Sequence, residues 1–223
     1  MNSKKLSQRL RLCADFVTEG CRVADIGTDH AALPVFLVQS GRCGGAVASD
    51  LRKGPLSSAG KNIKAAGLSE KISTRLSNGF DEIAEEEFDE AVIAGMGGLL
   101  ICDILRRTPY RNSKSFILQP MSDPEEVRRW LYLHGFEITR EKAACEGKRV
   151  YVVMRADYTG QTRVLSDFEA LAGTLSANPG KEEKEYFKKL SRTLEKQIEG
   201  KGHTDADISP LKALKSQIDI LLR

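Results

Sequence analysis

A regular alternation of short apolar segments with longer helical patterns, between residues 23 and 156, constrains the fold of this chain more than any other feature. The apolar segments have the length and composition of buried strands, and most of the helical patterns between them stop at glycine. We expect strands at 23–26, 46–50, 72–76, 90–94 and 115–119, and helices at 31–40, 55–66, after residue 98 to about 106, and at 124–134. Such alternation forms βαβ units, which predicts a parallel sheet.

Segments on either side of this alternation complete the predicted domain. An amphipathic helix is expected at 4–19, before the first strand. Residues 136–143 and 149–156 face each other across Glu146-Gly147-Lys148 and predict a hairpin, which would add an antiparallel strand at one edge of the sheet. The sequence therefore predicts an α/β fold over residues 1–157, with a doubly wound, mostly parallel sheet of seven strands.

The pattern changes to purely helical after residue 157. One helix is expected from Ser166 to about 178 and a second at 181–199, and Ser209-Pro210 is typical of the N-cap and first residue of a third. The last two helices carry apolar stripes and predict a coiled-coil-like antiparallel hairpin, so residues 158–223 form a second predicted domain. Its 11 basic and 10 acidic residues nearly cancel. We therefore expect an arm that recognises the shape of a partner, and a catalytic domain that folds without it.

Charge and composition narrow the function classes only in part. The 34 Lys and Arg residues against 31 Asp and Glu give a net charge of +3, which leaves a nucleic-acid partner open. Lys4, Lys5, Arg9 and Arg11 form a basic group that either contacts phosphates or is a solvated helix face. No apolar run approaches the roughly 20 residues that cross a bilayer, so we expect a cytoplasmic protein without a membrane partner. The five cysteines lack metal-ligand spacing, so no metal is expected.

The end of the first predicted strand carries the most specific chemistry. Parallel α/β sheets bind ligands at the carboxyl ends of their strands, where this chain has Asp25-Ile26-Gly27-Thr28-Asp29-His30. A dinucleotide site requires G-x-G-x-x-G, but Asp29 stands where the second glycine would be. A carboxylate there would repel a pyrophosphate. The segment instead suits a ligand with a positive group and no phosphate, such as S-adenosylmethionine, with its ammonium and sulfonium.

The ends of the other strands extend this site. Asp50, with Leu51 beside it, follows Gly27 by 23 residues, where an acid binds the ribose hydroxyls of an adenosine. Asn78-Gly79 would meet the adenine edge, and Gly95-Met96-Gly97-Gly98 would leave space for the methyl acceptor. Gln119 could bond the edge of a target base. Each assignment has an alternative. Asp50 could be a helix cap or a surface acid, and Asn78-Gly79 could be a plain turn. The glycines at 95–98 could serve tight strand–helix packing.

Five motifs of this chain together resemble those of the bacterial tRNA (adenine-22-N1)-methyltransferase family (TrmK), which are class I S-adenosylmethionine-dependent enzymes. The family pattern D-I-G-S-D-H-A-Y-L-P appears at 25–34, I-A-G-M-G-G at 93–98 is unchanged, and L-I-L-Q-P-N appears at 116–121. L-S-x-R-L at 6–10 and G-P at 54–55 also match. Three departures are Ala32 for the family tyrosine, Asp50 for the usual glutamate and Met121 for the asparagine. If that tyrosine contacts the target base, this chain has lost its ring.

The resemblance implies a Rossmann-like methyltransferase sheet and methylation of adenine N1 at position 22 of tRNA, in the D-arm region. Asp29 and His30 are the expected catalytic residues, although Asp29 could equally bind the ammonium of the donor and His30 could only cap the helix. Arg9 is expected to hold the donor carboxylate or to join Lys4 and Lys5 on tRNA, and the chain is expected to be a monomer. The donor site is predicted from Arg9, Asp25, Gly27, Asp29, Asp50, Leu51, Asn78, Gly79, Gly95 and Met96, and the acceptor site from Gly97, Gly98, Gln119, Lys4 and Lys5.

Two other classes of function remain open at this point. The chain could methylate another RNA or a protein, which labelled donor and bulk fractions would distinguish. It could also be a non-catalytic donor-binding or nucleotide-binding module that docks a partner through the helical hairpin. The glycines at 95–98 argue against a module, because an open acceptor loop would have no use if nothing were methylated.

Overall fold

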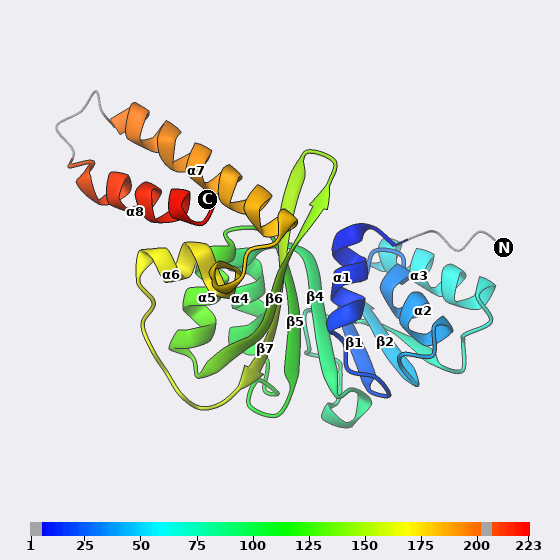
Figure 1. Ribbon diagram of the computed structural model, residues 1–223. Helices are drawn as coiled ribbons and strands as arrows, with labels where there is room; N and C mark the ends of the chain where they lie inside the picture. Colours follow the sequence, from blue (N-terminus) through cyan, green and yellow to red (C-terminus); the bar gives the residue numbers. More distant parts are fainter. Residues whose placement is uncertain (1–5, 202–206) are drawn as a thin grey trace.

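A seven-stranded sheet forms the centre of the molecule in the computed structural model, which describes residues 6–201 and 207–223 (Figure 1). The strand order is β3-β2-β1-β4-β5-β7-β6. The strands are β1 (Arg22–Ile26), β2 (Gly45–Asp50), β3 (Ile72–Leu76), β4 (Glu90–Gly97), β5 (Ser115–Ser122), β6 (Phe136–Glu146) and β7 (Arg149–Tyr158). β7 runs antiparallel to both of its neighbours, β5 and β6, and the pairs among β1, β2, β3, β4 and β5 are parallel. The predicted doubly wound, mostly parallel α/β fold is confirmed.

Helices cover both faces of this sheet, which is the defining feature of a doubly wound fold. The first face packs on α1 (Gln8–Phe16), α2 (Ala32–Gln39) and α3 (Lys53–Ala65). The second packs on α4 (Gly98–Arg107), α5 (Pro124–Leu133) and the C-terminal helices. Successive residues of one strand serve opposite faces: Val92 is buried in the first core and Ile93 in the second.

Three details of the expected topology are wrong. The antiparallel strand is not at the edge, because β7 lies between β5 and β6, and β6 is the edge strand. β4 continues through Gly97 and pairs with a longer β5 across register shifts at Met96, so the glycine segment is an irregular strand end instead of a free loop. Ser209 is already helical, with Ile208 before it as the N-cap. Separately, residues 4 and 5 of the helix expected at 4–19 lie outside the described residues, and the helix α1 spans Gln8–Phe16.

The C-terminal helices share a core with the sheet domain. They are α6 (Asp167–Ala172), the 3-10 turn η2 (Gly173–Ala177), α7 (Lys181–Lys201) and α8 (Ser209–Ile220); a further 3-10 turn, η1 (Glu85–Glu87), precedes β4. Phe187, Leu194 and Ile218 are buried in the same apolar cluster as Val127 of α5. This packing argues against the expectation that residues 1–158 fold alone, since cutting there would expose that cluster to water.

A buried ion pair fixes this junction. Arg128 of α5 and Glu141 of β6 have fully buried side chains with 2.8 Å between nitrogen and oxygen. The Arg128 guanidinium also donates to the carbonyls of Ala170 and Leu171 and to the hydroxyl of Tyr186 on α7. A buried charge needs such partners to offset its lost hydration. The helical arm is thereby held in one orientation against the sheet.

Candidate donor and acceptor sites

A cleft of about 650 Å³ opens at the carboxyl edge of the sheet. This volume lies within the range of small-molecule and cofactor sites. All ten residues expected to bind the donor line it, together with His30. Other lining residues, which the sequence analysis did not assign to the donor site, include Thr28, Arg52, Ser77, Leu100 and Ile104. The carboxyl edge is therefore where the expected donor residues meet.

The turn after β1 shapes the floor of the cleft. Gly27 has a φ of +77°, so the backbone favours glycine, and an added Cβ would also meet the flexible end of the Met96 side chain, which would have to move. Thr28 is buried, and its hydroxyl accepts a bond from the N–H of Ala31. Sequence reasoning missed Thr28, since its role depends on the folded turn. Ala31 itself is left-handed, with a φ of 53°, a strained conformation for a residue with a side chain.

Asp25 presents a buried carboxylate to the cleft. Only 7% of the residue is exposed, and burial raises the pKa of its carboxyl to about 6; the negative charge of Asp50 adds to this rise, while a hydrogen bond with Thr28 opposes it. Among the described residues no cation pairs with this carboxylate. A cationic ligand group would supply the missing partner.

Asp50 ends β2 with one oxygen committed and one available. Its Oδ1 accepts the backbone N–H of Arg52 at 2.7 Å, and the Arg52 side chain lies 3.6 Å away. No other partner of this carboxylate occurs among the described residues, so Oδ2 is left for hydroxyl donors in the cleft. Because Arg52 contacts only Oδ1, Asp50 can still accept hydrogen bonds from ribose hydroxyls, as expected.

The ends of β3 and β4 form the remaining walls. The buried hydroxyl of Ser77 donates to the carbonyl of Gly79 and accepts the N–H of Glu82, which fixes the turn that carries Asn78. Gly79 has a φ of +64° and Gly95 one of +80°, so both positions favour glycine for the backbone alone. The plain-turn alternative thus accounts for Gly79, and Gly95 is favoured by its own backbone conformation, while Asn78 stays exposed beside the cleft.

Gly97 and Gly98 differ in what surrounds them. An added Cβ on Gly98 would lie 2.5 Å from the carbonyl oxygen of Asp123, so its missing side chain is required by strand–helix packing. Gly97 has an ordinary φ of −64°, and its nearest neighbour would be the Ser122 hydroxyl at 3.4 Å. Gly97 therefore has room for a Cβ and Gly98 does not, and neither glycine lines the donor cleft.

Gln119 has a different environment from the one expected. It is fully buried, and its Oε1 accepts bonds from Arg9 at 2.8 Å and from the N–H of Gly95 at 3.1 Å. Its Nε2 donates to the carbonyl of Pro120. With both polar ends engaged, Gln119 has no free atom for a target base, and the expected base contact is corrected to a role in holding Arg9 and Gly95.

Arg9 extends from α1 into the cleft and is held in place by Glu146 of the β6–β7 hairpin. Glu146 accepts the backbone N–H of Arg9 at 2.8 Å, and its carboxylate lies 3.7 Å from Nε of the side chain. Nε and one terminal nitrogen of Arg9 therefore face protein partners, and the other terminal nitrogen has no partner among the described residues. Sequence reasoning missed Glu146, because a contact across 137 residues leaves no local signal.

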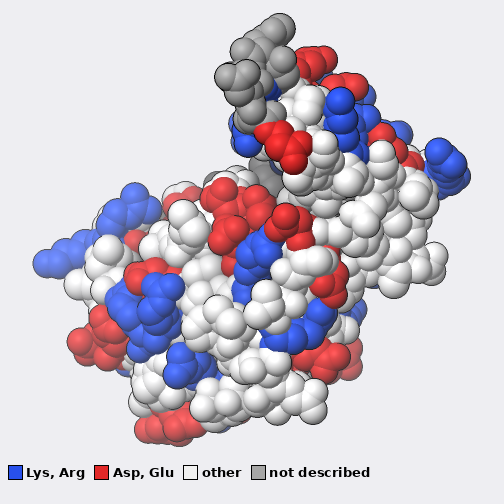
Figure 2. Space-filling view, turned by 90° about the vertical axis from the view of Figure 1, so that its left-hand side faces the viewer, with Lys and Arg blue, Asp and Glu red and all other residues white. Residues whose placement is uncertain are grey.

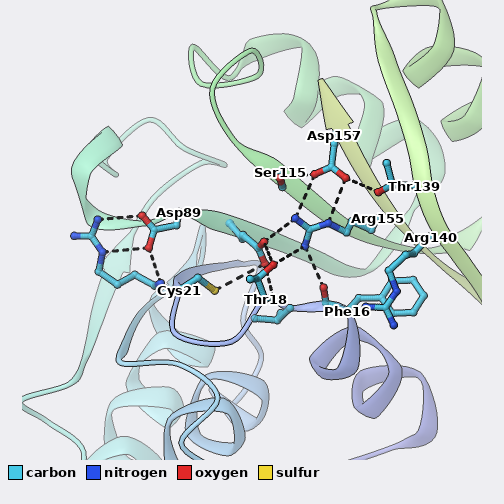
Figure 3. A network of polar contacts seen from close by, with 12 residues as sticks. Phe16, Thr18, Cys21, Asp89, Ser115, Thr139, Arg140, Arg155 and Asp157 are labelled. Atoms are coloured by element: carbon cyan, nitrogen blue, oxygen red, sulfur yellow. Dashed lines mark hydrogen bonds and ion pairs between the residues drawn. The ribbon is translucent and has the colours of Figure 1, made fainter. Parts of the chain in front are cut away.

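The opposite end of α1 is fixed at the amino edge of the sheet (Figure 3). Arg155 donates to the carbonyl of Phe16 at 3.1 Å and pairs with the buried Glu90 at 2.8 Å. Glu90 also accepts the N–H and the hydroxyl of Thr18, just after the helix. Asp157, which accepts from Ser115 and Thr139, holds Arg155 in turn. The helix that carries Arg9 is thus anchored at both ends.

Asp29 and His30 lie together at the rim of the cleft. The His30 Nε2 is 3.4 Å from a carboxylate oxygen of Asp29, and the two side chains are 48% and 79% exposed. The alternative that His30 caps α2 is wrong, since Ala31 occupies the N-cap position and no side chain caps the helix. Ala32 is exposed at the same rim. Lys4 and Lys5 lie outside the described residues.

The charges of the cleft fit S-adenosylmethionine. Three carboxylates, from Asp25, Asp29 and Asp50, oppose phosphate and favour a cationic ligand. Arg9 supplies a guanidinium that can pair with a carboxylate at one end, and Asp50 offers an oxygen to hydroxyls at another. A sulfonium donor with an amino-acid end and a ribose carries all three of these complementary groups.

A fold and cleft of this kind define a Rossmann-like methyltransferase. Comparison of the chain with known families and solved structures gives the same class. Residues 6–154 match the family model described as a methyltransferase domain. A Streptococcus pneumoniae protein solved in complex with S-adenosyl-L-methionine is 32% identical, with a TM-score of 0.86 over 98% of this chain and all of that one. A Mycoplasma capricolum TrmK structure with S-adenosyl-homocysteine is 26% identical, with a TM-score of 0.80 over 97% of this chain and 96% of that one.

The full length of the chain matches one curated relative. The tRNA (adenine(22)-N(1))-methyltransferase of Bacillus subtilis is 32% identical over 231 aligned residues, which cover 99% of this chain and 97% of the relative. The chain therefore belongs to the tRNA (adenine(22)-N(1))-methyltransferase family, as the motifs had indicated. No helix among residues 6–201 and 207–223 is long and apolar enough to cross a membrane.

Proposed function

We propose that this protein transfers a methyl group from S-adenosylmethionine to N1 of adenine 22 in tRNA. The observation that carries the proposal is the full-length likeness to the B. subtilis enzyme, combined with a cleft whose charges fit the donor. We further propose that it acts in the cytoplasm, where tRNA is its substrate, and as a monomer, because all ten expected donor residues of one chain meet in one cleft.

The donor would be held by groups that the fold already orients. Asp25, buried and without a cationic partner among the described residues, would face the ammonium, and Arg9 would bind the carboxylate with its available nitrogen. Asp50 would accept the ribose hydroxyls, Leu51 would cover the adenine, and Asn78 would meet its edge. The bound donor supplies an electrophilic methyl group on sulfur. The protein contributes mainly by positioning this group against its acceptor.

The acceptor would approach beside Gly97, at the paired ends of β4 and β5. Adenine N1 carries a lone pair, so no strong base is needed to begin the displacement. Asp29 at the rim is proposed to stabilise the positive charge that develops on the base, with His30 holding that carboxylate. Asp25 rather than Asp29 suits the donor ammonium better, because Asp25 is buried and Asp29 is largely exposed.

The direct test of this function uses two tRNA transcripts that differ only at position 22. Purified protein and labelled S-adenosylmethionine should label the transcript with adenine 22, and mass mapping should place the methyl on that base. A transcript with guanine at position 22 should take no label. Equal labelling of both transcripts, or labelling of a bulk protein fraction instead, would refute the proposal.

Replacement of Asp50 by alanine should weaken donor binding by about 1–3 kcal/mol, because charge-assisted bonds to the ribose are lost. Calorimetry with S-adenosylhomocysteine measures this directly. Asp81→Ala removes an exposed acid outside the cleft and should bind normally. Unchanged affinity in Asp50→Ala would remove this residue from the site. Tight binding of NADH to the native protein would contradict the exclusion of phosphates.

Replacement of Asp25 by asparagine should stabilise the donor-free protein at pH 7 and weaken donor binding. The pKa of Asp25 is raised to about 6 on folding, so the folded state holds a proton more tightly than the unfolded chain does. The native protein thus gains stability as pH falls through about 6 toward 4, and carries the cost of a buried charge above that range. By the free energy per pKa unit this cost is about 1–3 kcal/mol at pH 7.

Urea unfolding of Asp25→Asn and the native protein between pH 4 and 8 measures this difference. The variant should be the more stable protein above pH 6, and the two curves should converge toward pH 4. Donor affinity of the native protein should also fall below pH 6, as the carboxylate is protonated. A variant that is less stable than the native protein at pH 7 would show that Asp25 has a structural partner instead.

A further inference from the structure

Two thiols lie close together at the amino edge of the sheet, opposite the donor cleft. Cys21 immediately precedes β1, and Cys43 lies two residues before β2. Their sulfur atoms are 4.0 Å apart, although 22 positions separate the residues in the sequence. Surface charge forms no comparable cluster on the face shown in Figure 2, where Lys and Arg are interspersed among Asp and Glu. This thiol pair is a reactive group that neither the donor site nor the acceptor site uses.

The backbone holds the thiol pair together from both sides. Before the two thiols, the N–H of Gly20 donates to the carbonyl of Arg42 at 2.8 Å. After them, Arg22 lies opposite Gly45 in the parallel pairing of β1 with β2. Neighbouring strands lie about 4.7–4.9 Å apart, and a disulfide spans about 4.4–6.8 Å between Cα atoms. The two sulfurs need to approach each other by about 2 Å to bond, which rotation of the side chains supplies.

The two thiols differ in exposure and in acidity. Cys43 is 3% exposed, whereas Cys21 is half-buried and faces solvent in part. Their mutual hydrogen bond raises the pKa of Cys21 and lowers the pKa of Cys43. Burial and the charge of Glu90 oppose the fall at Cys43, and Arg42 adds to it. Because the thiolate is the reactive form of cysteine, Cys43 is the nucleophile of the pair and Cys21 stands ready beside it.

Cys21 also contacts the network that anchors α1. Its sulfur is 3.8 Å from the Glu90 carboxylate, and Figure 3 shows it directed toward that group. Glu90 has stronger partners in the N–H and hydroxyl of Thr18 and in Arg155. The buried carboxylate would keep these partners if the Cys21 thiol turned away, so Cys21 is free to react without leaving a buried charge unpaired.

We propose that Cys21 and Cys43 form a reversible disulfide when the protein meets a small peroxide. The Cys43 thiolate attacks one peroxide oxygen and becomes a sulfenic acid, while the O–O bond breaks and the leaving hydroxide takes up the proton that Cys43 had released. The Cys21 sulfur then attacks the Cys43 sulfur; the S–S bond forms, the S–O bond breaks, and the thiol proton leaves with the oxygen as water. Two thiols are oxidised and one peroxide is reduced to two waters.

The bridge protects both sulfurs, because a sulfenic acid that is trapped as a disulfide does not proceed to the irreversible sulfinic acid. A reversible bridge also suits the cytoplasm, where lasting disulfides are rare. It closes a ring of residues 21–43, which contains β1, α2 and the turn at Gly27. The length of β1, about 17 Å at about 3.3 Å per residue, separates the bridge from that turn. Donor binding is therefore unaffected, and this site does not depend on the proposed function.

Mass spectrometry of peroxide-treated native protein, digested without reductant, tests the proposal. We expect the protein to lose the mass of two hydrogens, with the bridge located between Cys21 and Cys43, and dithiothreitol to reverse the change. Labelling of Cys21 with a maleimide should fall at least tenfold on oxidation and recover on reduction. Cys145 is half-buried like Cys21 but has no thiol partner among the described residues. Cys145→Ser should therefore form the bridge as the native protein does, and Cys21→Ser should not.

Thermal unfolding and calorimetry describe the bridged protein. Closing the ring should raise Tm by about 5–10 °C, and the Kd for S-adenosylhomocysteine should stay within twofold. Native protein that keeps both thiols, or gains oxygen at Cys21 or Cys43 without a bridge, would overturn the proposal, and this result needs no variant. A donor Kd that rises with the bridged fraction would contradict closure by side-chain rotation. If the native protein forms the bridge but methylates no tRNA, the proposed function fails and the thiol site stands.

Discussion

Replacement of Glu141 by glutamine should lower the free energy of unfolding by about 3–5 kcal/mol, the effect of removing one partner of a buried ion pair. Arg128 would keep its charge, since a guanidinium is not deprotonated in proteins. In the native protein burial lowers the pKa of Arg128, but Glu141 and Tyr186 more than offset this effect and raise it. Its nearest carboxylate would be gone, with both side chains wholly buried. Glu141 also accepts the N–H of Thr174, so η2 would lose a contact as well.

Urea denaturation measures this loss, and a nearby surface pair provides the control. Arg129, next to Arg128, pairs with Asp167 of α6 at 2.5 Å, but the Asp167 side chain is 78% exposed. Asp167→Asn should therefore cost less than about 1 kcal/mol, as exposed pairs do. A Glu141→Gln protein that unfolds within 1 kcal/mol of the native protein would show that the junction between α5, β6 and α7 is held by apolar packing alone.

The fold could be predicted from the sequence because its signals are local. Five apolar segments between helical patterns fixed the parallel part of the sheet, and strands ended within a few residues of expectation. The position of β7 could not be derived in this way. A hairpin pattern shows that β6 and β7 pair with each other, but which of them lies against β5 depends on packing across the whole sheet.

In the candidate site, too, local signals were predictable from the sequence and long-range contacts were not. Residues at strand ends, such as Asp25, Asp50 and Asn78, could be assigned to one cleft because parallel strands place their carboxyl ends together. The environment of Gln119 was not predictable, since its partner Arg9 lies 110 residues earlier. The Arg128–Glu141 pair had no sequence signal, because its side chains come from α5 and β6, which meet only in the folded chain.

Replacement of Gly97 by valine should lower methyl transfer to tRNA at least a hundredfold and leave donor affinity within about threefold. The backbone at Gly97 has a φ of −64° and ψ of 146°, which valine adopts readily. An added Cβ would meet only the Ser122 hydroxyl, at 3.4 Å, so the fold tolerates the change. The branched side chain would instead project beside the paired ends of β4 and β5, where we propose that the target base approaches. A misplaced acceptor costs far more in rate than in donor binding.

Gly98→Ala distinguishes this effect from simple damage to the strand end. Its Cβ would lie 2.5 Å from the backbone of Asp123, so we expect a less stable protein in which donor binding and methylation fall together. Calorimetry with S-adenosylhomocysteine, thermal unfolding and single-turnover methylation are measured for both variants. Gly97→Val should lose only the last of these three properties. If it loses donor affinity and stability in parallel with activity, Gly97 serves the fold or the donor site, and the acceptor must approach the methyl group from elsewhere along the cleft.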